Sequence, residues 1–237
     1  MATIVYGRNA VRASIDACNV KTLYVARHLD GDKLVDYARK KKLDVKFVEN
    51  NDLTRMAKNS SHQGFVAIGE DYALSSIEEI IESAKVKQYP LIVILDGIED
   101  PHNLGAILRT ADAFGVDGII MKNRGQVQLN GTVAKVSTGA INYVKVAAVN
   151  NLSNAIEKLK QSGYWIVASD GSANQSYLDI DYKCPIALVV GSEGFGIAPL
   201  VLKRSDFVVK IPMHGHVSCL NASVATAVIL AGIISSR

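Results

Sequence analysis

From residue 90 onward, the hydrophobic positions fall into short continuous runs separated by polar or helix-forming segments. The first run, 91–95, is five consecutive aliphatic residues, a pattern typical of a strand buried on both faces of a parallel sheet. Further apolar runs predict strands at 118–121, 144–147, 165–168, 187–190 and 207–211. Helices are predicted near 132–137, 152–161 and 198–203. This alternation predicts an α/β domain with about six mostly parallel strands.

The segment after the first strand has the periodicity of an amphipathic helix. Its apolar stripe consists of Leu104, Ile107, Leu108, Ala111 and Phe114. Gly115 follows, where a glycine commonly ends a helix. Asn103 lies at the helix start and Arg109 lies off the stripe, so both are candidates for the carboxyl edge of the sheet, where open α/β sheets bind ligands. The common alternative for Arg109 is a surface salt bridge.

Residues 1–70 show a second, smaller alternation of apolar and polar segments. A short helix is predicted to begin at 7–12, with further helical segments at 33–42 and 52–58 and strands at 22–26, 45–48 and 65–68. We expect a small α/β sandwich. Its lysines at 40–42 favour a solvated helix end, and the polar turn at 60–64 could contact phosphates or merely connect. Residues 71–89 are polar with helical periodicity and predict a partly helical linker before the domain at 90–237.

Composition describes an ordinary globular protein. Of the 237 residues, 49% are hydrophobic and 21% charged, which is enough for a substantial core. The net charge of +3 permits an acidic partner such as RNA without requiring one. The three isolated cysteines, Cys18, Cys184 and Cys219, suit a reducing cytosol better than a disulfide framework. Without an apolar signal region or a stretch of about 18 apolar residues, a cytoplasmic protein that does not span a membrane is expected.

Two loops near the C-terminus are the strongest candidates for function. The strand at 187–190 runs into a loop at 191–196 that is rich in glycine, and the strand at 207–211 ends at Pro212. A loop at 213–221 then opens a helix of small residues, with Asn221 as a possible N-cap. If the strands are parallel neighbours, both loops lie at one carboxyl edge.

Other interpretations of these loops are weaker. A dinucleotide fingerprint needs glycine where Glu193 stands, because the backbone must approach a pyrophosphate there. A carboxylate repels phosphate but tolerates a cationic ligand. The loop could also be a plain glycine-rich connector. His214 and His216 lie two apart with no third ligand in evidence, so no metal site is expected.

Three motifs, in order and spacing, resemble the SpoU family of RNA ribose methyltransferases in the SPOUT superfamily. They are D-x-x-x-D-P-x-N-x-G-A-x-x-R-T-A at 96–111, G-x-E-G-x-G at 191–196 and I-P-M-x-G-x-V-x-x-L-N-x-S-V-A at 211–225. The N-terminal unit is similar to the small ribosomal-protein-like RNA-binding domain of the 23S rRNA guanosine 2′-O-methyltransferases in this family. The resemblance therefore covers essentially the whole chain.

The resemblance implies a catalytic domain with a deep trefoil knot that binds S-adenosylmethionine, and a homodimer whose two subunits complete each site. Carried over residue by residue, Gly191, Ile211 and Leu220 would hold the cofactor. The catalytic positions would be Asn103, Arg109, Glu193 and Asn221. The expected reaction is 2′-O-methylation of a ribose, most simply of a guanosine in 23S rRNA. Methylation of tRNA or of another rRNA nucleotide is the alternative within this class.

Cys219 departs from the family pattern. The family usually has Ser-Leu-Asn where this chain has Cys219, Leu220 and Asn221. A thiol preserves size but is a weak hydrogen-bond partner. The exchange is either benign or a sign of altered activity, and it is the one feature that favours a different class of protein, a non-catalytic RNA-binding or ribosome assembly factor.

Overall fold

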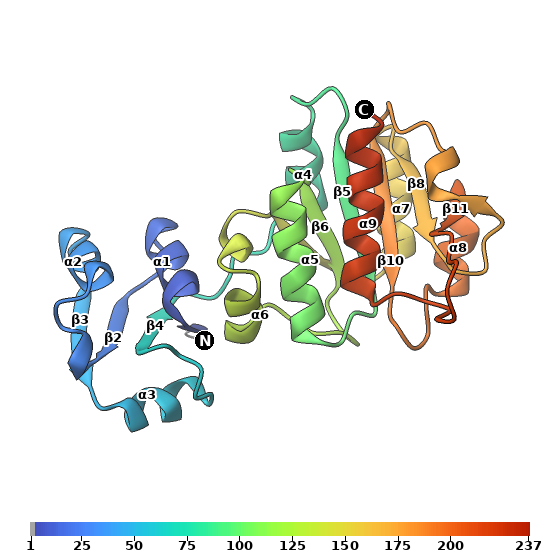
Figure 1. Ribbon diagram of the computed structural model, residues 1–237. Helices are drawn as coiled ribbons and strands as arrows, with labels where there is room; N and C mark the ends of the chain where they lie inside the picture. The colour runs from blue at the N-terminus through green and yellow to red at the C-terminus, as the bar shows by residue number, and fades with distance from the viewer. Residues whose placement is uncertain (1–2) are drawn as a thin grey trace. The chain divides into compact units, whose positions relative to one another are not determined.

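The computed structural model describes residues 3–237, which form two compact units (Figure 1). The N-terminal unit contains residues 3–73 together with 129–143. The larger unit contains residues 74–128 and 144–237.

The N-terminal unit is built on a four-stranded sheet in the order β1-β4-β2-β3. These strands are β1 (Thr3–Tyr6), β4 (Phe65–Gly69), β2 (Thr22–Ala26) and β3 (Asp44–Val48). β4 pairs antiparallel with β1 and β2, while β2 and β3 are parallel. Its helices are α1 (Arg8–Asp16), the 3-10 turn η1 (Arg27–Leu29), α2 (Lys33–Lys40) and α3 (Asn50–Ala57). The predicted strands and helices are confirmed to within two residues at most ends, whereas β1 was not predicted.

The segment between two strands of the larger unit folds with the N-terminal unit. It contains α6 (Gly131–Val136) and the 3-10 turn η2 (Ala140–Asn142). A Cβ on Gly131 would lie only 2.0 Å from the carbonyl oxygen of Ile4, so this helix packs directly on the backbone of β1. Lys135 Nζ donates to the carbonyl oxygen of Ser61 at 2.8 Å. The helix expected near 132–137 therefore forms, and its partners come from the start of the chain.

The larger unit contains a seven-stranded sheet in the order β7-β6-β5-β10-β8-β11-β9, in which every neighbouring pair is parallel. The strands are β5 (Leu91–Asp96), β6 (Gly118–Lys122), β7 (Val146–Val149), β8 (Trp165–Ser169), β9 (Gln175–Ser176), β10 (Ile186–Gly191) and β11 (Phe207–Lys210). This confirms the predicted mostly parallel sheet and adds the two-residue edge strand β9.

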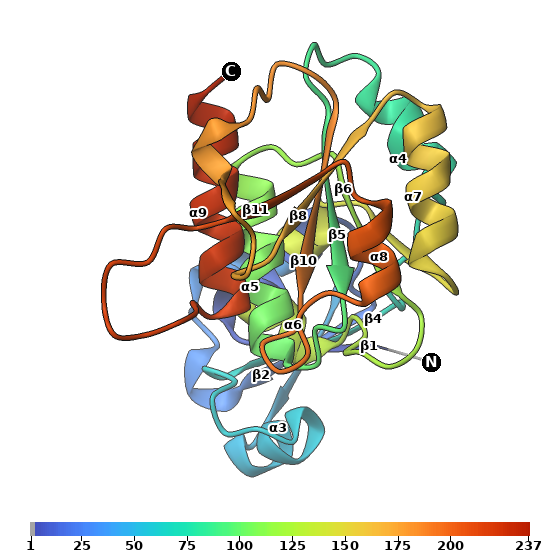
Figure 2. The same cartoon turned by 90° about the vertical axis from the view of Figure 1, so that its right-hand side faces the viewer.

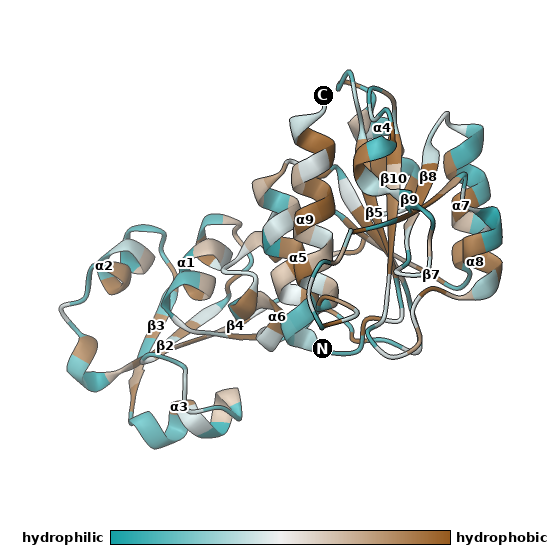
Figure 3. Cartoon of the chain, turned by 45° about the vertical axis from the view of Figure 1, so that its right-hand side comes forward, coloured by the Kyte–Doolittle hydropathy of each residue, from teal (hydrophilic) through white to brown (hydrophobic). Residues whose placement is uncertain are grey.

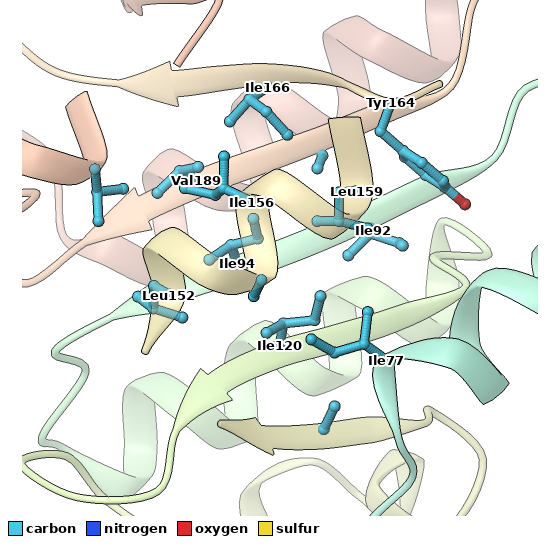
Figure 4. Close-up of a cluster of buried hydrophobic side chains, with 14 of the residues drawn as sticks. Ile77, Ile92, Ile94, Ile120, Leu152, Ile156, Leu159, Tyr164, Ile166 and Val189 are labelled. Atoms are coloured by element: carbon cyan, nitrogen blue, oxygen red, sulfur yellow. The ribbon is translucent and has the colours of Figure 1, made fainter. Parts of the chain in front are cut away.

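Helices cover both faces of this sheet (Figures 1 and 2). One face carries α4 (Ile77–Ala84), α7 (Leu152–Gln161) and α8 (Pro199–Arg204), whose apolar side chains pack on the strands (Figure 4). The other face carries α5 (Pro101–Ala113) and α9 (Ala222–Ser235), which lie side by side, with the 3-10 turn η3 (Tyr177–Asp179) against α9. Because both faces are covered, the strands are buried and their continuous aliphatic runs are explained.

The side chain of Arg237 joins four backbone carbonyl groups. Its guanidinium donates to the oxygens of Tyr182 at 3.0 Å, Tyr89 at 2.7 Å, Cys184 at 3.2 Å and Pro90 at 3.4 Å. Burial lowers the pKa of this guanidinium, but arginine keeps its charge at neutral pH. These contacts hold the end of α9 to the chain that enters β5 and β10.

We expect Arg237→Ala to lower the free energy of unfolding by about 2 kcal/mol, because half-buried carbonyl groups lose a charged donor. Urea denaturation monitored by circular dichroism measures this. Arg237→Lys should recover only part of the loss, because an ammonium lacks the planar fork of donors. Equal stability of all three proteins would contradict a stabilising role for the Arg237 hydrogen bonds.

Among residues 3–237, no helix is long and apolar enough to cross a membrane.

Candidate active site

A cavity of about 260 Å³ opens where β8, β10 and β11 end. The residues that directly follow each of these strands lie at this edge of the sheet. The walls consist of Ser169, Asp170, Gly171, Val190, Gly191, Ser192, Glu193, Gly196, Ile211, Met213, Ser218, Cys219, Leu220, Ala222 and Ala225. All three residues predicted to hold a cofactor, Gly191, Ile211 and Leu220, are among them.

The loop after β10 is a tight turn that leaves no room for a side chain at its base. Ser192 and Gly196 form an antiparallel bridge, with backbone hydrogen bonds of 3.1 and 2.9 Å. A Cβ on Gly191 would lie 2.3 Å from the carbonyl carbon and oxygen of Gly196. Gly196 itself has φ +65°, a left-handed conformation that favours glycine. The glycines of this loop are therefore explained by close packing of backbone on backbone beside the cavity.

Three of the predicted polar residues meet through Glu193, which lines the cavity. Glu193 Oε1 accepts from Asn103 Nδ2 at 3.1 Å, from the backbone nitrogen of Ala222 at 3.2 Å and from Asn221 Nδ2. Asn221 Nδ2 also donates to Asn103 Oδ1 at 2.9 Å. The Glu193 carboxylate therefore sits at the N-terminus of α9, where the helix dipole stabilises a negative charge.

Asn221 serves two purposes at once. Its Oδ1 caps α9 by accepting from the backbone nitrogens of Ser223 at 2.9 Å and Val224 at 3.3 Å. Its Nδ2 points to Glu193 and Asn103. The predicted N-cap is confirmed, and the same side chain belongs to the polar cluster.

A second cavity, of about 230 Å³, lies against the first. It is lined by Gly97, Ile98, Glu99, Asp100, Asn103, Ser192, Glu193, Gly194, Phe195 and Ala222. Ser192, Glu193 and Ala222 line both cavities, so they form the wall between them. Glu193, which holds Asn103 and Asn221, therefore stands where a group in one cavity would meet a group in the other.

Comparison with known proteins decides the family. Residues 90–231 match the model of the SpoU rRNA methylase family, and residues 4–75 match the model for RNA 2′-O ribose methyltransferase substrate binding. The chain belongs to the SpoU rRNA methylase family. This membership confirms the resemblance seen in the three motifs.

Relatives in sequence and structure agree with this SpoU assignment. A Staphylococcus haemolyticus protein of the TrmH family of tRNA/rRNA methyltransferases is 41% identical over 99% of this chain and 96% of that protein. The crystal structure of the SpoU methyltransferase AviRb from Streptomyces viridochromogenes, in complex with AdoMet, has a TM-score of 0.84 at 23% identity and covers 100% of this chain and 90% of that one. The TrmH/SpoU tRNA modifying enzyme of A. aeolicus is 31% identical with a TM-score of 0.59, over 68% of this chain and 82% of that one.

Arg109 lies apart from the other motif residues of this SpoU chain. Its side chain is exposed on α5 and, within residues 3–237, makes no hydrogen bond or ion pair, so the salt-bridge alternative is not observed. It follows Asn103 by six residues, which corresponds to about 9 Å along the helix axis and about 120° around it. The structure thus brings Asn103, Glu193 and Asn221 together, whereas Arg109 lies on the helix surface without a partner among the described residues.

Two aspartates support the SpoU site beyond the predicted set. The buried carboxylate of Asp96, at the end of β5, accepts from the backbone nitrogen of Ala198 at 2.8 Å and pairs with Lys122 at 2.5 Å. It therefore fixes the far end of the glycine loop. Asp170 follows β8 and lines the first cavity. The signal that could have identified it is a carboxylate two residues after the strand predicted at 165–168.

The remaining sequence candidates of the SpoU chain lie in the loop before α9. Cys219 is exposed and lines the first cavity together with Ser218 and Met213. Within residues 3–237, no group of three or more His, Cys, Asp or Glu side chains is arranged to hold a metal ion. His214 and His216 are exposed and do not line either cavity.

Proposed function

We propose that this SpoU chain transfers the methyl group of S-adenosylmethionine to a ribose 2′-hydroxyl of structured RNA. The observation that carries the proposal is the pair of adjoining cavities with Glu193 in their common wall, where it accepts hydrogen bonds from Asn103 and Asn221. Such an arrangement separates a cofactor from a substrate while allowing their reacting atoms to meet.

The first cavity fits the cofactor chemically. Gly191 presents bare backbone, and Ile211 and Leu220 offer apolar surface next to backbone polar groups, a combination suited to adenine. Asp170 and Glu193 contribute two carboxylates, which favour a cationic sulfonium over a phosphorylated nucleotide. The AviRb structure, which holds AdoMet and has the same fold, supports this choice. S-adenosylmethionine supplies the activated methyl group when bound.

The second cavity is the proposed place of the target ribose. In the proposed transfer the 2′-oxygen would bond to the methyl carbon as the bond from that carbon to sulfur breaks, and the hydroxyl proton would pass to water. Asn103 and Asn221, held through Glu193, would orient the hydroxyl in line. Arg109 would stabilise the developing negative charge on the oxygen and grip a neighbouring phosphate, since a guanidinium is poorly suited to act as a literal base.

A homodimer and a knot are part of the same proposal. α9 is apolar along its length (Figure 3), and its Val224 and Ile234 are exposed in the single chain. Covering them with a second copy would remove apolar surface from water and would complete each site, since the Arg109 side chain has no hydrogen bond or ion pair within residues 3–237. The long loop from Ile211 to Asn221 before α9 is the segment that a trefoil knot would involve.

The RNA class rests on the N-terminal unit. Residues 4–75 match a substrate-binding model, and the A. aeolicus tRNA modifying enzyme covers only 68% of this chain. Within the described chain, Lys40, Lys41 and Lys42 are exposed and form no ion pair, although Lys41 Nζ lies 5.8 Å from the centre of the Tyr37 ring, so this basic stretch is accessible to phosphates. We therefore favour 23S rRNA over tRNA, and action in the cytoplasm, where its three free cysteines would stay reduced.

Glu99 supports guanosine as the target. Its carboxylate is exposed, lines the second cavity and makes no hydrogen bond or ion pair within residues 3–237. A carboxylate can accept from N1–H and the 2-amino group of guanine together, whereas none of the other bases presents two adjacent donors at that edge. On this basis we propose that Glu99 selects guanine.

We expect Glu99→Gln to lower methyl transfer to a guanosine target about tenfold. The carboxylate has two oxygens that accept hydrogen bonds, and in glutamine one of them is replaced by an NH₂ group that can only donate. The same RNA with inosine, which lacks the 2-amino group, provides the control: the wild type should prefer guanosine, and the variant should not. An unchanged preference in the variant would remove this support for guanosine.

The direct test is methyl transfer from labelled S-adenosylmethionine to protein-free 23S rRNA, mapped by primer extension sensitive to 2′-O-methylation. One guanosine stop is the expected result. A stop in tRNA, or at another base, would select the alternative substrate. If the folded protein binds the cofactor but transfers no methyl group to 23S rRNA, tRNA or ribosomal precursors, the proposal fails. The chain would then be a binding or assembly factor. Methyl transfer by Cys219→Ser would show whether the thiol is responsible for the lost activity.

A further inference from the structure

Phe195 is the most exposed large hydrophobic side chain within residues 3–237, at 94% of its possible surface. A single exposed apolar side chain is common and needs no explanation by itself. Phe195, however, also lines the second cavity, which contains Asn103 and Glu193. An aromatic ring in water beside a polar reaction site is a feature that the proposed chemistry does not use.

The glycine loop holds Phe195 in this position. The Ser192–Gly196 bridge closes the turn, and the backbone nitrogen of Phe195 donates to Ser192 Oγ at 3.2 Å. Two residues earlier, Glu193 is bound to the polar cluster through Asn103 and Asn221. Glu193 and Phe195 are therefore fixed relative to each other by one short turn, with the carboxylate on the cavity wall and the ring at its edge.

We propose that Phe195 stacks on the base of the nucleotide whose ribose enters the second cavity. This inference rests on the proposed function, which places that ribose beside Glu193. A nucleotide must be unstacked from its neighbours for its 2′-hydroxyl to reach an enclosed site, and an aromatic side chain compensates for the stacking that the base loses. Phenylalanine has no polar atom on its ring, so Phe195 contributes affinity for any base and leaves the choice of base to other residues.

The test combines a protein change with an RNA change. The RNA is a 23S rRNA hairpin around the guanosine that methyl transfer identifies, either intact or with that nucleotide reduced to an abasic ribose. Binding of both RNAs is measured for the wild-type protein and for Phe195→Ala, by fluorescence anisotropy of labelled RNA. Val86→Ala is the matched control, because Val86 is 89% exposed and lines neither cavity.

We expect Phe195→Ala to raise the Kd of the intact hairpin by about 10- to 100-fold. Removing the base should weaken wild-type binding by at least this factor, because the hydrogen bonds to the base are lost as well, and Phe195→Ala should have little further effect on the abasic hairpin. Phe195→Trp should restore the affinity, and its fluorescence should be quenched by the intact hairpin but not by the abasic one. Val86→Ala should bind as the wild type does, and the affinity of Phe195→Ala for S-adenosylmethionine should not change.

Independent losses, in which the fold-changes of the two alterations multiply, would overturn the proposal. So would an unchanged Kd for Phe195→Ala. A change in the mass of the assembly on light scattering would assign Phe195 to a contact between copies of the chain instead. Failure of the proposed function has a different signature, because the wild type would then transfer no methyl group to any RNA, whatever residue stands at 195.

Discussion

Gly191→Ala is expected to lower the affinity for S-adenosylmethionine by about 10- to 100-fold while the sheet stays folded. The added Cβ would lie 2.3 Å from the backbone of Gly196 and 2.5 Å from the backbone nitrogen of Ile197. Backbone cannot swing aside as a flexible side chain can, so the loop has to shift. Forcing a methyl group into a packed site costs about 1–3 kcal/mol, which corresponds to this range of affinity.

The same loop offers its own control. A Cβ on Gly194 would meet nothing within 4 Å, so Gly194→Ala adds the same atom to the same loop without a clash. Isothermal titration with S-adenosylmethionine, together with thermal unfolding of both variants, separates a binding defect from general instability. If Gly191→Ala binds as tightly as Gly194→Ala, the close contact does not shape the cofactor site, and the role of Gly191 has to be abandoned.

The strands of the larger unit could be predicted because both faces of the sheet are covered, which makes each buried strand a continuous apolar run. The short strands β1 and β9 gave no such signal, because four or two residues are too few to show a period. The sequence could not predict that the segment 129–143 packs with the N-terminal unit. That packing depends on contacts between residues far apart in the chain, such as Gly131 and Ile4. Local pattern does not report such pairings.

The site divides in the same way. Asn103, Glu193 and Asn221 could be named from three motifs, and their hydrogen bonds confirm that the fold brings them together. What the motifs could not show is that Glu193 stands in a wall between two cavities, because this depends on how the loops after β5 and β10 lie beside each other. Arg109 belongs to the same motif as Asn103, but it lies about 120° further around the helix and so points to a different side. Its side chain makes no hydrogen bond or ion pair within residues 3–237, so the proposed role requires RNA or a second subunit as its partner.

Arg109→Ala should lower the rate of methyl transfer by about 10²–10³-fold, the usual effect of removing one group that stabilises a developing oxyanion. Because the side chain is exposed and makes no hydrogen bond or ion pair within residues 3–237, the free energy of unfolding should change by less than about 0.5 kcal/mol. The affinity for S-adenosylmethionine should also stay the same, since Arg109 does not line the first cavity.

Single-turnover methyl transfer, cofactor titration and urea denaturation of the same preparation measure these three quantities. Asp112→Ala, another exposed change on α5, should transfer methyl groups as the wild type does. Arg109→Lys keeps the charge but loses the planar fork, so it should recover only part of the rate if the guanidinium grips a phosphate and the oxyanion together. Full activity of Arg109→Ala would leave Asn103, Glu193 and Asn221 as the whole catalytic set. The charge on the ribose oxygen would then have to be stabilised from within their cluster, next to the N-terminus of α9.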